Sequence, residues 1–228
     1  MVSKAEKEFL KKYKVERYER PSVAVDILVF TIREGKLHIL LIKRGTHPFR
    51  DMLALPGGFV GIKEDLRDAA MRELFEETNV KGIHIEQFQT FGKPDRDPRT
   101  RVITVAYIAL INSENIKLLS RADAADAFWI SIKKIPKKIA FDHKKIIKQG
   151  LGYLREKLEQ GSPIAFQLLP SSFTLSELQK TYEIILNKKL DKRNFRKKIL
   201  SLGILKPTKR KKKGVHRPAQ LYKFKRKG

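Results

Sequence analysis

The chain contains 228 residues and has a net charge of +25, from 50 basic and 25 acidic side chains. This length suits one large domain or two small ones, each with its own hydrophobic core. No apolar run approaches the roughly 18 residues typical of a transmembrane helix. The Lys- and Glu-rich first 20 residues do not resemble a secretory signal. Because there is no cysteine, disulfides, thiolate metal sites and cysteine nucleophiles are excluded, and we expect a cytoplasmic protein.

The positive charge is concentrated in less than a third of the chain. Residues 161–228 hold 19 basic and three acidic side chains, a net charge of +16, and the first 160 residues carry the remaining +9. Such an asymmetry is typical of a polyanion-binding module attached to a more neutral domain. A disordered basic tail is the alternative, but the apolar residues of this segment keep a regular pattern.

Apolar periodicity predicts a short polar helix, a β-hairpin, an acidic helix, three further strands and a long helix before residue 160. The expected helices are 3–13, 65–78 and 142–158, and the expected strands are 23–30, 37–42, 83–91, 102–111 and 127–132. Residues 53–60 contain a Pro56-Gly57-Gly58 break, and Asp142 is expected to cap the long helix. This order favours an α/β sandwich over a doubly wound sheet. The sequence Gln-Gly-Ser-Pro at 160–163 marks the expected boundary between domains 1–160 and 161–228.

The acidic helix carries three glutamates on one face. Glu73, Glu76 and Glu77 lie at i, i+3 and i+4, within an arc of roughly 100°. Carboxylates held this close repel one another unless a cation lies among them, and Mg²⁺ accepts carboxylate oxygens while sharing its shell with substrate phosphates. The expected core-facing residues of this helix are Met71, Leu74, Phe75 and Thr78. The helix therefore predicts a metal-dependent site for a phosphate-bearing ligand rather than a solvated acidic surface.

Residues 58–80 resemble the Nudix box, G-x5-E-x7-R-E-U-x-E-E-x-G-U. The matching residues are Gly58, Glu64, Arg72, Glu73, Leu74, Glu76, Glu77 and Val80. The one departure is Asn79, which stands where the family has glycine. We expect Asn79 to adopt the left-handed conformation of a helix C-cap, because Asn tolerates that conformation best after glycine.

This resemblance implies an α/β/α sandwich and a ligand in which a diphosphate is linked to another moiety. It also implies that Glu73, Glu76 and Glu77 bind Mg²⁺ or Mn²⁺, that one of them helps to activate water, and that two further residues, Glu64 and Arg72, orient them. A bound cation would neutralise the diphosphate and lower the pKa of a coordinated water. The identity of the base is left open, with Glu73 as one candidate.

The expected ligand-binding residues outside this helix are Gly57, Gly58, Arg20, Arg44 and Arg96. Arg20 and Arg44 could meet the phosphate or ribose of a ligand, although each can also be interpreted as a solvated surface charge. Arg96 lies in a proline-containing loop that could line the pocket or a dimer contact. His143 follows the expected helix cap and is interpreted as structural rather than catalytic.

After residue 163 the pattern predicts two helices and a basic hairpin. The capping box from Thr174 to Glu177 opens the first helix, and Asp191 caps a second helix that ends near Gly203. A basic turn at 209–214 and a strand at 221–224 follow. This order is typical of a winged helix-turn-helix, in which the second helix enters the major groove of DNA.

The expected DNA-binding residues are Arg193, Asn194, Arg196, Lys197, Lys211, Lys212 and Lys213. Arg193 and Asn194 are candidates for contacts to base edges, whereas the lysines would contact phosphates. The basic residues of the second helix are expected to face away from its buried stripe, which consists of Phe195, Ile199 and Leu202. Docking of this module against the first domain or a partner protein, and binding of RNA, are the alternatives.

Together the two parts resemble the Nudix-related transcriptional regulators of the NrtR-like family, bacterial repressors of NAD-metabolism genes. The resemblance extends to the segments 18–23, 55–60, 94–98, 141–143 and 191–196. It implies a homodimer that binds a palindromic double-stranded DNA operator and uses ADP-ribose or a related sugar nucleotide as effector.

Two other functions remain open for this chain. Many of these regulators have lost Nudix glutamates, whereas this chain keeps them, so a Mg²⁺-dependent ADP-ribose pyrophosphatase is one alternative. A sugar-responsive regulator of a catabolic operon, as in a winged sister group, is the other.

Overall fold

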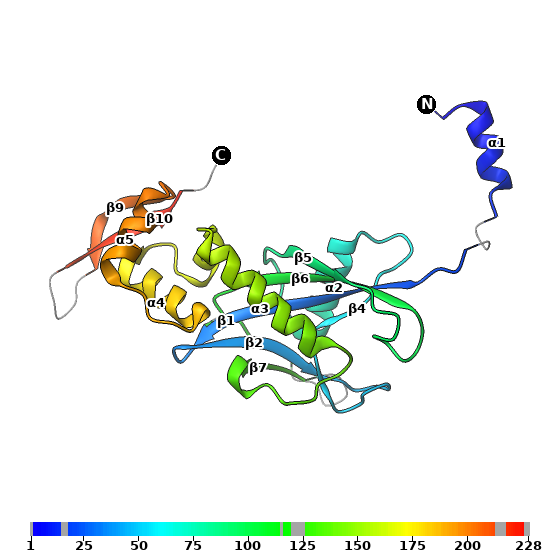
Figure 1. The fold of residues 1–228 in the computed structure, drawn as a ribbon, viewed down its shortest axis with the longest axis horizontal. Coiled ribbons are helices and arrows are strands. Elements are labelled where there is room, and N and C mark those ends of the chain that lie inside the picture. Colours follow the sequence, from blue (N-terminus) through cyan, green and yellow to red (C-terminus); the bar gives the residue numbers. More distant parts are fainter. Residues whose placement is uncertain (1, 15–17, 115, 120–125, 213–217, 226–228) are drawn as a thin grey trace.

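The computed structural model describes residues 2–14, 18–114, 116–119, 126–212 and 218–225. A larger N-terminal body of strands and helices occupies the centre of the molecule, and a small C-terminal domain lies at one end (Figure 1). Among the described residues, no helix is long and apolar enough to cross a lipid bilayer.

The N-terminal body follows the expected order of elements. Its helices are α1 (Lys4–Lys12), α2 (Leu66–Thr78) and α3 (His143–Glu159), and a short 3-10 helix, η2, spans Ile132–Lys134. Its strands are β1 (Ser22–Arg33), β2 (Lys36–Lys43), β3 (Leu53–Ala54), β4 (Gly57–Phe59), β5 (Glu86–Phe91), β6 (Val102–Leu110) and β7 (Ala127–Ser131).

These strands form one mixed sheet with β1 at its centre. The sheet order is β3-β2-β1-β6-β5, with β4 paired to β1 and β7 paired to β2. Strands β1 and β6 run parallel, from Ser22 opposite Val102 to Phe30 opposite Leu110, whereas β1 and β2 form an antiparallel hairpin. The β-branched and aliphatic side chains of β1 are buried from residue 25 to residue 31, as a strand covered on both faces requires.

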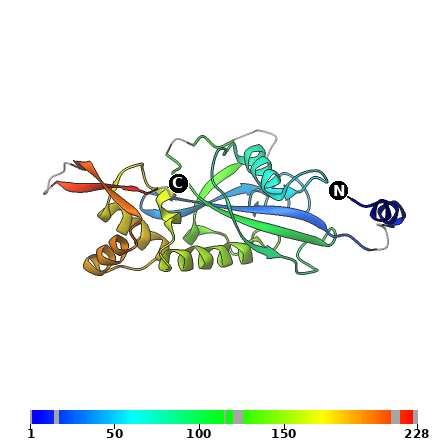
Figure 2. The ribbon, with the colours of Figure 1, turned by 90° about the horizontal axis from the view of Figure 1, so that it is seen from above.

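Helices α2 and α3 cover opposite faces of the sheet (Figure 2). Alternate residues of β1 point to opposite sides, so Leu28 and Phe30 pack with Ile146 and Leu154 of α3 in one core. Val25, Ile27 and Val29 pack with the α2 residues in a second core, which includes Ala69, Ala70 and Leu74. The expected α/β/α sandwich is therefore confirmed.

The C-terminal domain is a winged helix. Its elements are the 3-10 helix η3 (Pro163–Leu168), β8 (Phe173–Thr174), α4 (Leu175–Leu186), α5 (Lys192–Ser201), β9 (Leu205–Lys212) and β10 (Ala219–Phe224). The capping box is present, because the N–H of Glu177 donates to Thr174 Oγ1 at 3.2 Å and the N–H of Thr174 donates to Glu177 Oε2 at 2.7 Å. The Asp191 carboxylate accepts the N–H of Asn194 at 2.8 Å and so caps α5.

The two parts of the chain share a hydrophobic core. Leu154 and Leu158 of α3 belong to the same buried cluster as Leu178 and Ile185 of α4 and Phe195 of α5. Helix α3 thus packs on the sheet along its length and on the winged helix near its C-terminal end. The two expected domains, 1–160 and 161–228, are therefore in contact through buried apolar side chains.

Three local expectations were wrong. Phe75 does not pack on the core but is 42% exposed, because the buried face of α2 is centred on Ala70, Leu74 and Thr78. Asp142 precedes α3 but makes no side-chain cap, because its carboxylate pairs with Arg96.

The third concerns the wing, in which residues 209–212 continue strand β9 instead of turning. The short strand β8 was missed altogether, because two residues carry no readable periodicity, and it pairs with β10. Lys213, an expected DNA contact, lies outside the described residues.

Candidate functional site

Helix α2 is capped at both ends, and the C-terminal cap is the expected one, Asn79. The Asp65 carboxylate accepts the N–H of Arg67 at 2.9 Å, which caps the helix N-terminus. Asn79 adopts the left-handed conformation with φ of 62°, and its N–H donates to the carbonyl of Phe75 at 2.8 Å. Its side-chain amide also donates to the carbonyl of Lys117 at 3.1 Å. Asn79 therefore replaces the glycine of the Nudix box without changing the helix end.

Arg72 of α2 contacts three carboxylates, those of Glu64 before the helix and of Glu73 and Glu76 on it. Its guanidinium donates to both carboxylate oxygens of Glu64, at 2.7 and 2.9 Å, in a bidentate pair. A third N–H group donates to Glu73 at 2.8 Å and to Glu76 at 3.2 Å. Hydrogen bonds from Arg72 and from the N–H of Gly61 lower the pKa of Glu64 to about 2, and these ion pairs raise the pKa of Arg72. Glu64 and Arg72 are thus placed where they can orient the other carboxylates.

Glu77 is half-buried and is the carboxylate of α2 that contacts the glycine turn. Its Oε2 accepts the N–H of Gly57 at 2.9 Å, which ties α2 to the glycine turn before β4. Burial raises the pKa of Glu77 to about 8, the hydrogen bond from Gly57 opposes this shift, and the nearby Glu73 carboxylate adds to it. A cation beside these two side chains would favour their ionised forms.

The two glycines of the turn are required by close contacts. A Cβ atom on Gly58 would collide with the carboxylate of Glu73, and one on Gly57 would collide with the carbonyl oxygen of Val25. Gly57 also has a φ of +154°, which side chains rarely adopt. Both glycines therefore allow β4 to lie against β1 and against the glutamates of α2.

The glutamates of α2 have the donor atoms that a divalent cation prefers, but they are not arranged around a common point. Carboxylate oxygens are the donors that Mg²⁺ and Mn²⁺ prefer. Within the described part of the chain, however, no three His, Cys, Asp or Glu side chains converge as a metal site, and Arg72 occupies oxygens of Glu73 and Glu76. Joint metal binding by Glu73, Glu76 and Glu77 remains a prediction, which rests on the carboxylate type of these residues.

A pocket of about 110 Å³ opens beside the glycine turn. Its lining includes Asp26, Arg44, Leu55, Gly57, Gly58, Phe59, Arg96, Asp97, Arg99, Phe141 and His143. Arg44 lies over the Phe141 ring at 4.9 Å, and Arg99 lies over the Phe59 ring at 4.9 Å. Burial and the neighbouring charge of Arg99 lower the pKa of Arg44, so an anionic ligand would be favoured there.

Sequence reasoning missed three of these pocket residues. Phe59 and Phe141 lie in segments that carry the family resemblance, but neither they nor Arg99 were assigned to the ligand, because they meet only through the fold. Arg44 and Arg96, which the sequence indicated, do line the pocket, whereas Arg20 is exposed and does not.

Beneath the pocket, four polar side chains form a buried network. Arg96 donates to Asp26 at 3.3 Å and to Asp142 at 2.8 Å. The Nδ1 atom of His143 accepts the N–H of Leu55 at 2.9 Å, so it carries no proton, and the Nε2–H group faces Asp26 at 3.2 Å. Burial opposes ionisation of Asp26, but His143 and Arg96 outweigh it and hold the pKa of Asp26 below its usual value. His143 is therefore fixed between Leu55 and Asp26 at the base of the pocket, and its interpretation as a structural residue stays a prediction.

The expected DNA-binding residues lie on α5 and the wing. Arg193, Asn194, Lys197 and Lys211 are exposed. Arg196, which was expected to face away from the buried stripe of α5, is half-buried, and its guanidinium lies 3.5 Å from the hydroxyl of Ser176 of α4. Lys212 pairs with Glu177 at 2.6 Å, which links the wing to the start of α4.

A sandwich that carries a glycine turn and an acidic helix, joined to a basic winged helix, defines a Nudix-type ligand pocket attached to a DNA-binding module. Two family models match the chain, a NUDIX domain over residues 20–150 and an NrtR DNA-binding winged helix domain over residues 165–224. The chain belongs to the family of Nudix proteins with an NrtR-type winged helix.

Three relatives illustrate this membership. The ADPR responsive transcriptional repressor NtrR of Acinetobacter baylyi is 36% identical over 224 residues, which cover 96% of this chain and 88% of the relative. The structure of Shewanella oneidensis NrtR complexed with a 27mer DNA is 33% identical and superposes with a TM-score of 0.74, over 89% of this chain and 93% of that chain. An ADP-ribose pyrophosphatase of Methanocaldococcus jannaschii is 40% identical over 148 residues, 65% of this chain and 80% of the relative.

The raised pKa of Glu77 predicts a pH-dependent stability. Because its pKa rises from 4.5 to about 8 on folding, the stabilisation is complete below pH 4.5 and is lost as the pH rises through about 8. In EDTA, the free energy of unfolding of the wild type should fall by up to a few kcal/mol between about pH 5 and pH 9. Glu77→Gln, which keeps an acceptor for the N–H of Gly57, should show a smaller fall in urea denaturation.

Glu156→Gln, a change of an exposed residue of α3, is the matched control and should keep the wild-type pH profile. Parallel profiles of the wild type and Glu77→Gln would contradict the assignment of this pH dependence to Glu77.

Proposed function

We propose that this protein is a transcriptional repressor of NAD-metabolism genes that binds duplex DNA through α5 and the wing, and that ADP-ribose bound in the Nudix pocket changes its affinity for DNA. The observation that carries this proposal is the presence, in one chain, of an arginine- and aromatic-lined pocket and an exposed basic helix. Relatives named for a response to ADP-ribose and for a complex with DNA support it.

The chemistry of the pocket suits a nucleotide diphosphate. Arg44 and Arg99 supply positive charge for the diphosphate, and the rings of Phe59 and Phe141 offer flat surfaces on which a base or sugar can pack. Gly57 and Gly58 line the same pocket, and the N–H of Gly57 is already donated to Glu77. We assign Arg20 no direct contact with the ligand.

The exposed face of α5 suits the major groove of DNA. We propose that Arg193 and Asn194 reach base edges and that Lys197, together with Lys211 of the wing, contacts phosphates. Arg196 would instead brace α5 against α4, because its guanidinium is directed toward Ser176. A homodimer would present two such helices to a palindromic operator.

Binding of the protein to the DNA upstream of its own gene tests this proposal. We expect sequence-specific, salt-dependent binding in a gel mobility shift, and a change in DNA affinity of about 5- to 150-fold when ADP-ribose is added. Lys197→Ala should weaken binding to all sequences alike, whereas Arg44→Ala should keep DNA binding and lose the response to ADP-ribose.

Lys117→Ala, an exposed residue remote from α5 in the sequence, is the control for loss of one positive charge. Binding that ignores both salt and sequence would contradict the proposal. A response to a free sugar in place of ADP-ribose would favour the sugar-responsive alternative.

A second candidate function is hydrolysis of ADP-ribose by the same pocket, which the retained glutamates of α2 favour. A divalent cation held by Glu73, Glu76 and Glu77 would neutralise the diphosphate and lower the pKa of a bound water. Arg72 and Glu64 would keep these carboxylates in place, and Arg44 would bind the diphosphate. Water would then cleave the phosphoanhydride bond to give AMP and ribose 5-phosphate, and the protein would destroy its own effector.

Incubation with ADP-ribose and Mg²⁺ tests this second function. We expect release of AMP and ribose 5-phosphate by the wild type, and a rate at least about 10²-fold lower for Glu76→Gln, because metal binding and water activation need that carboxylate. Glu156→Gln serves again as the control. Absence of turnover would contradict this second function, and an unchanged rate in Glu76→Gln would contradict the role assigned to that carboxylate.

A further inference from the structure

A groove of about 400 Å³ separates the N-terminal body from the winged helix. One wall carries Lys36 at the start of β2 and Lys133 of η2, and the other carries Lys180 of α4. Lys188 and Lys189, from the turn between α4 and α5, lie at the same groove. Its walls are therefore positively charged on both sides.

Part of this charge is compensated within the protein, but three of the five lysines are not paired in the described ranges. Glu183 is the one acidic side chain that lines the groove, and its carboxylate accepts the N–H of Leu190 at 3.0 Å and Gln179 at 3.1 Å and pairs with Lys189 at 3.4 Å. Lys188 pairs with Glu159 at 2.6 Å, outside the groove lining. The other lysines are exposed, and in the described ranges no carboxylate lies within ion-pair distance of Lys36, Lys133 or Lys180.

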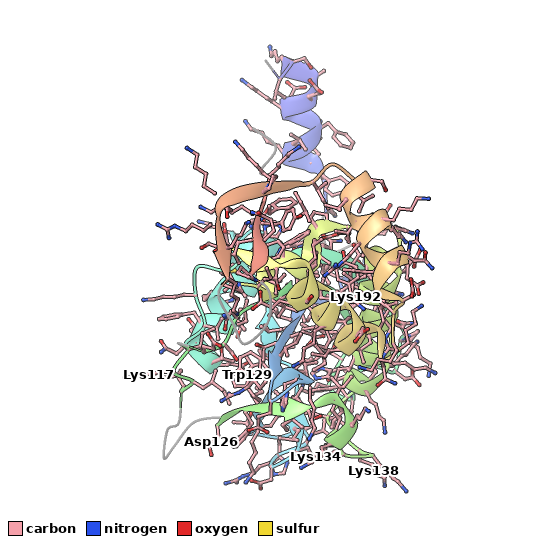
Figure 3. The ribbon with its side chains drawn as sticks, turned by 90° about the vertical axis from the view of Figure 1, so that its left-hand side faces the viewer. Lys117, Asp126, Trp129, Lys134, Lys138 and Lys192 are labelled. Atoms are coloured by element: carbon pink, nitrogen blue, oxygen red, sulfur yellow. The ribbon has the colours of Figure 1, made fainter. Side chains whose placement is uncertain are left out.

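The groove continues toward the DNA-binding helix. Lys188 and Lys189 also line a second hollow, whose other side is formed by Asn194 and Lys198 of α5. Figure 3 faces this end of the molecule and labels Lys134 and Lys138, which follow Lys133 along the chain, and Lys192 at the start of α5. Positive side chains thus extend from the N-terminal body, across the α4–α5 turn, to α5.

We propose that this groove binds the phosphate backbone of duplex DNA beside the segment that α5 contacts, so that the Nudix body takes a direct part in DNA binding. Like charges on two facing walls repel each other, and phosphates placed between them would relieve this repulsion. The lysines are exposed and come from both walls of the groove, rather than being buried around one small anion. The inference rests on the proposed binding of DNA and adds a second surface to it.

The salt dependence of DNA binding tests this inference. Each phosphate that a lysine neutralises contributes about 0.9 to the slope of log affinity against log salt concentration. With a fluorescent mixed-sequence duplex of about 40 base pairs, the full-length double variant Lys36→Gln/Lys133→Gln should show a slope smaller by about 1 to 2 than the wild type. Both lysines belong to the Nudix body and are remote in sequence from α5, so α5 remains unchanged.

Lys117→Gln/Lys148→Gln is the matched control, because it removes the same charge from two exposed lysines outside the groove lining. We expect it to keep the wild-type slope. If both double variants had the wild-type slope, the groove inference would be overturned while DNA binding by α5 stood. If the wild type bound no duplex at all, the proposed function would fail first and this inference with it.

Titration with inorganic pyrophosphate separates DNA from a small anion as the occupant. We expect Lys36→Gln/Lys133→Gln to bind pyrophosphate as the wild type does, because the remaining pyrophosphate binding would belong to the Nudix pocket. Loss of a pyrophosphate site in this variant, with an unchanged salt slope for DNA, would overturn the proposal and assign the groove to a small anion.

Discussion

One buried carboxylate, Asp26, constrains much of the N-terminal body. It lies within the central strand β1 and is 5% exposed, where an uncompensated charge would cost several kcal/mol. Arg96 and His143 provide the compensation, and they come from a loop and from the first turn of α3. His143 also accepts the N–H of Leu55. The contacts that compensate the Asp26 charge therefore join β1 to the loop of Arg96, to the start of α3 and, through His143, to Leu55, and all four residues line the ligand pocket.

Helix α3 connects this polar network to the winged helix. Its first residue, His143, belongs to the polar network, and its last turns share a hydrophobic core with the winged helix. Gly150 lets the helix approach the sheet closely, since a Cβ atom there would collide with Leu28. A ligand that moves His143 or its partners would therefore act on α3, which packs against both domains. The effect of ligand binding on DNA affinity would then depend on α3.

Local features of the structure were predictable from sequence, and nonlocal ones were not. The capping box at Thr174, the cap at Asp191 and the left-handed Asn79 follow from short-range backbone chemistry, and all three are present. The meeting of Phe59, Arg99 and Phe141 depends on how distant segments pack, and no spacing signals it. Asp142 has the residue type of a helix cap, but its carboxylate pairs with the buried Arg96 instead of capping α3. Phe75 was expected in the core because it is apolar, but the buried face of α2 is centred on Ala70, Leu74 and Thr78 and leaves it 42% exposed.

The central claim is that occupancy of the Nudix pocket and binding of DNA are coupled through one protein. Linkage makes this coupling reciprocal, so the affinity for ADP-ribose must change when DNA is bound by the same factor that ADP-ribose imposes on DNA binding. Calorimetric titration of ADP-ribose into the free protein and into its saturated complex with upstream DNA, in EDTA to prevent turnover, measures that factor directly. The account predicts unequal affinities, with a ratio that matches the effect on DNA. Equal affinities in the two titrations would contradict it.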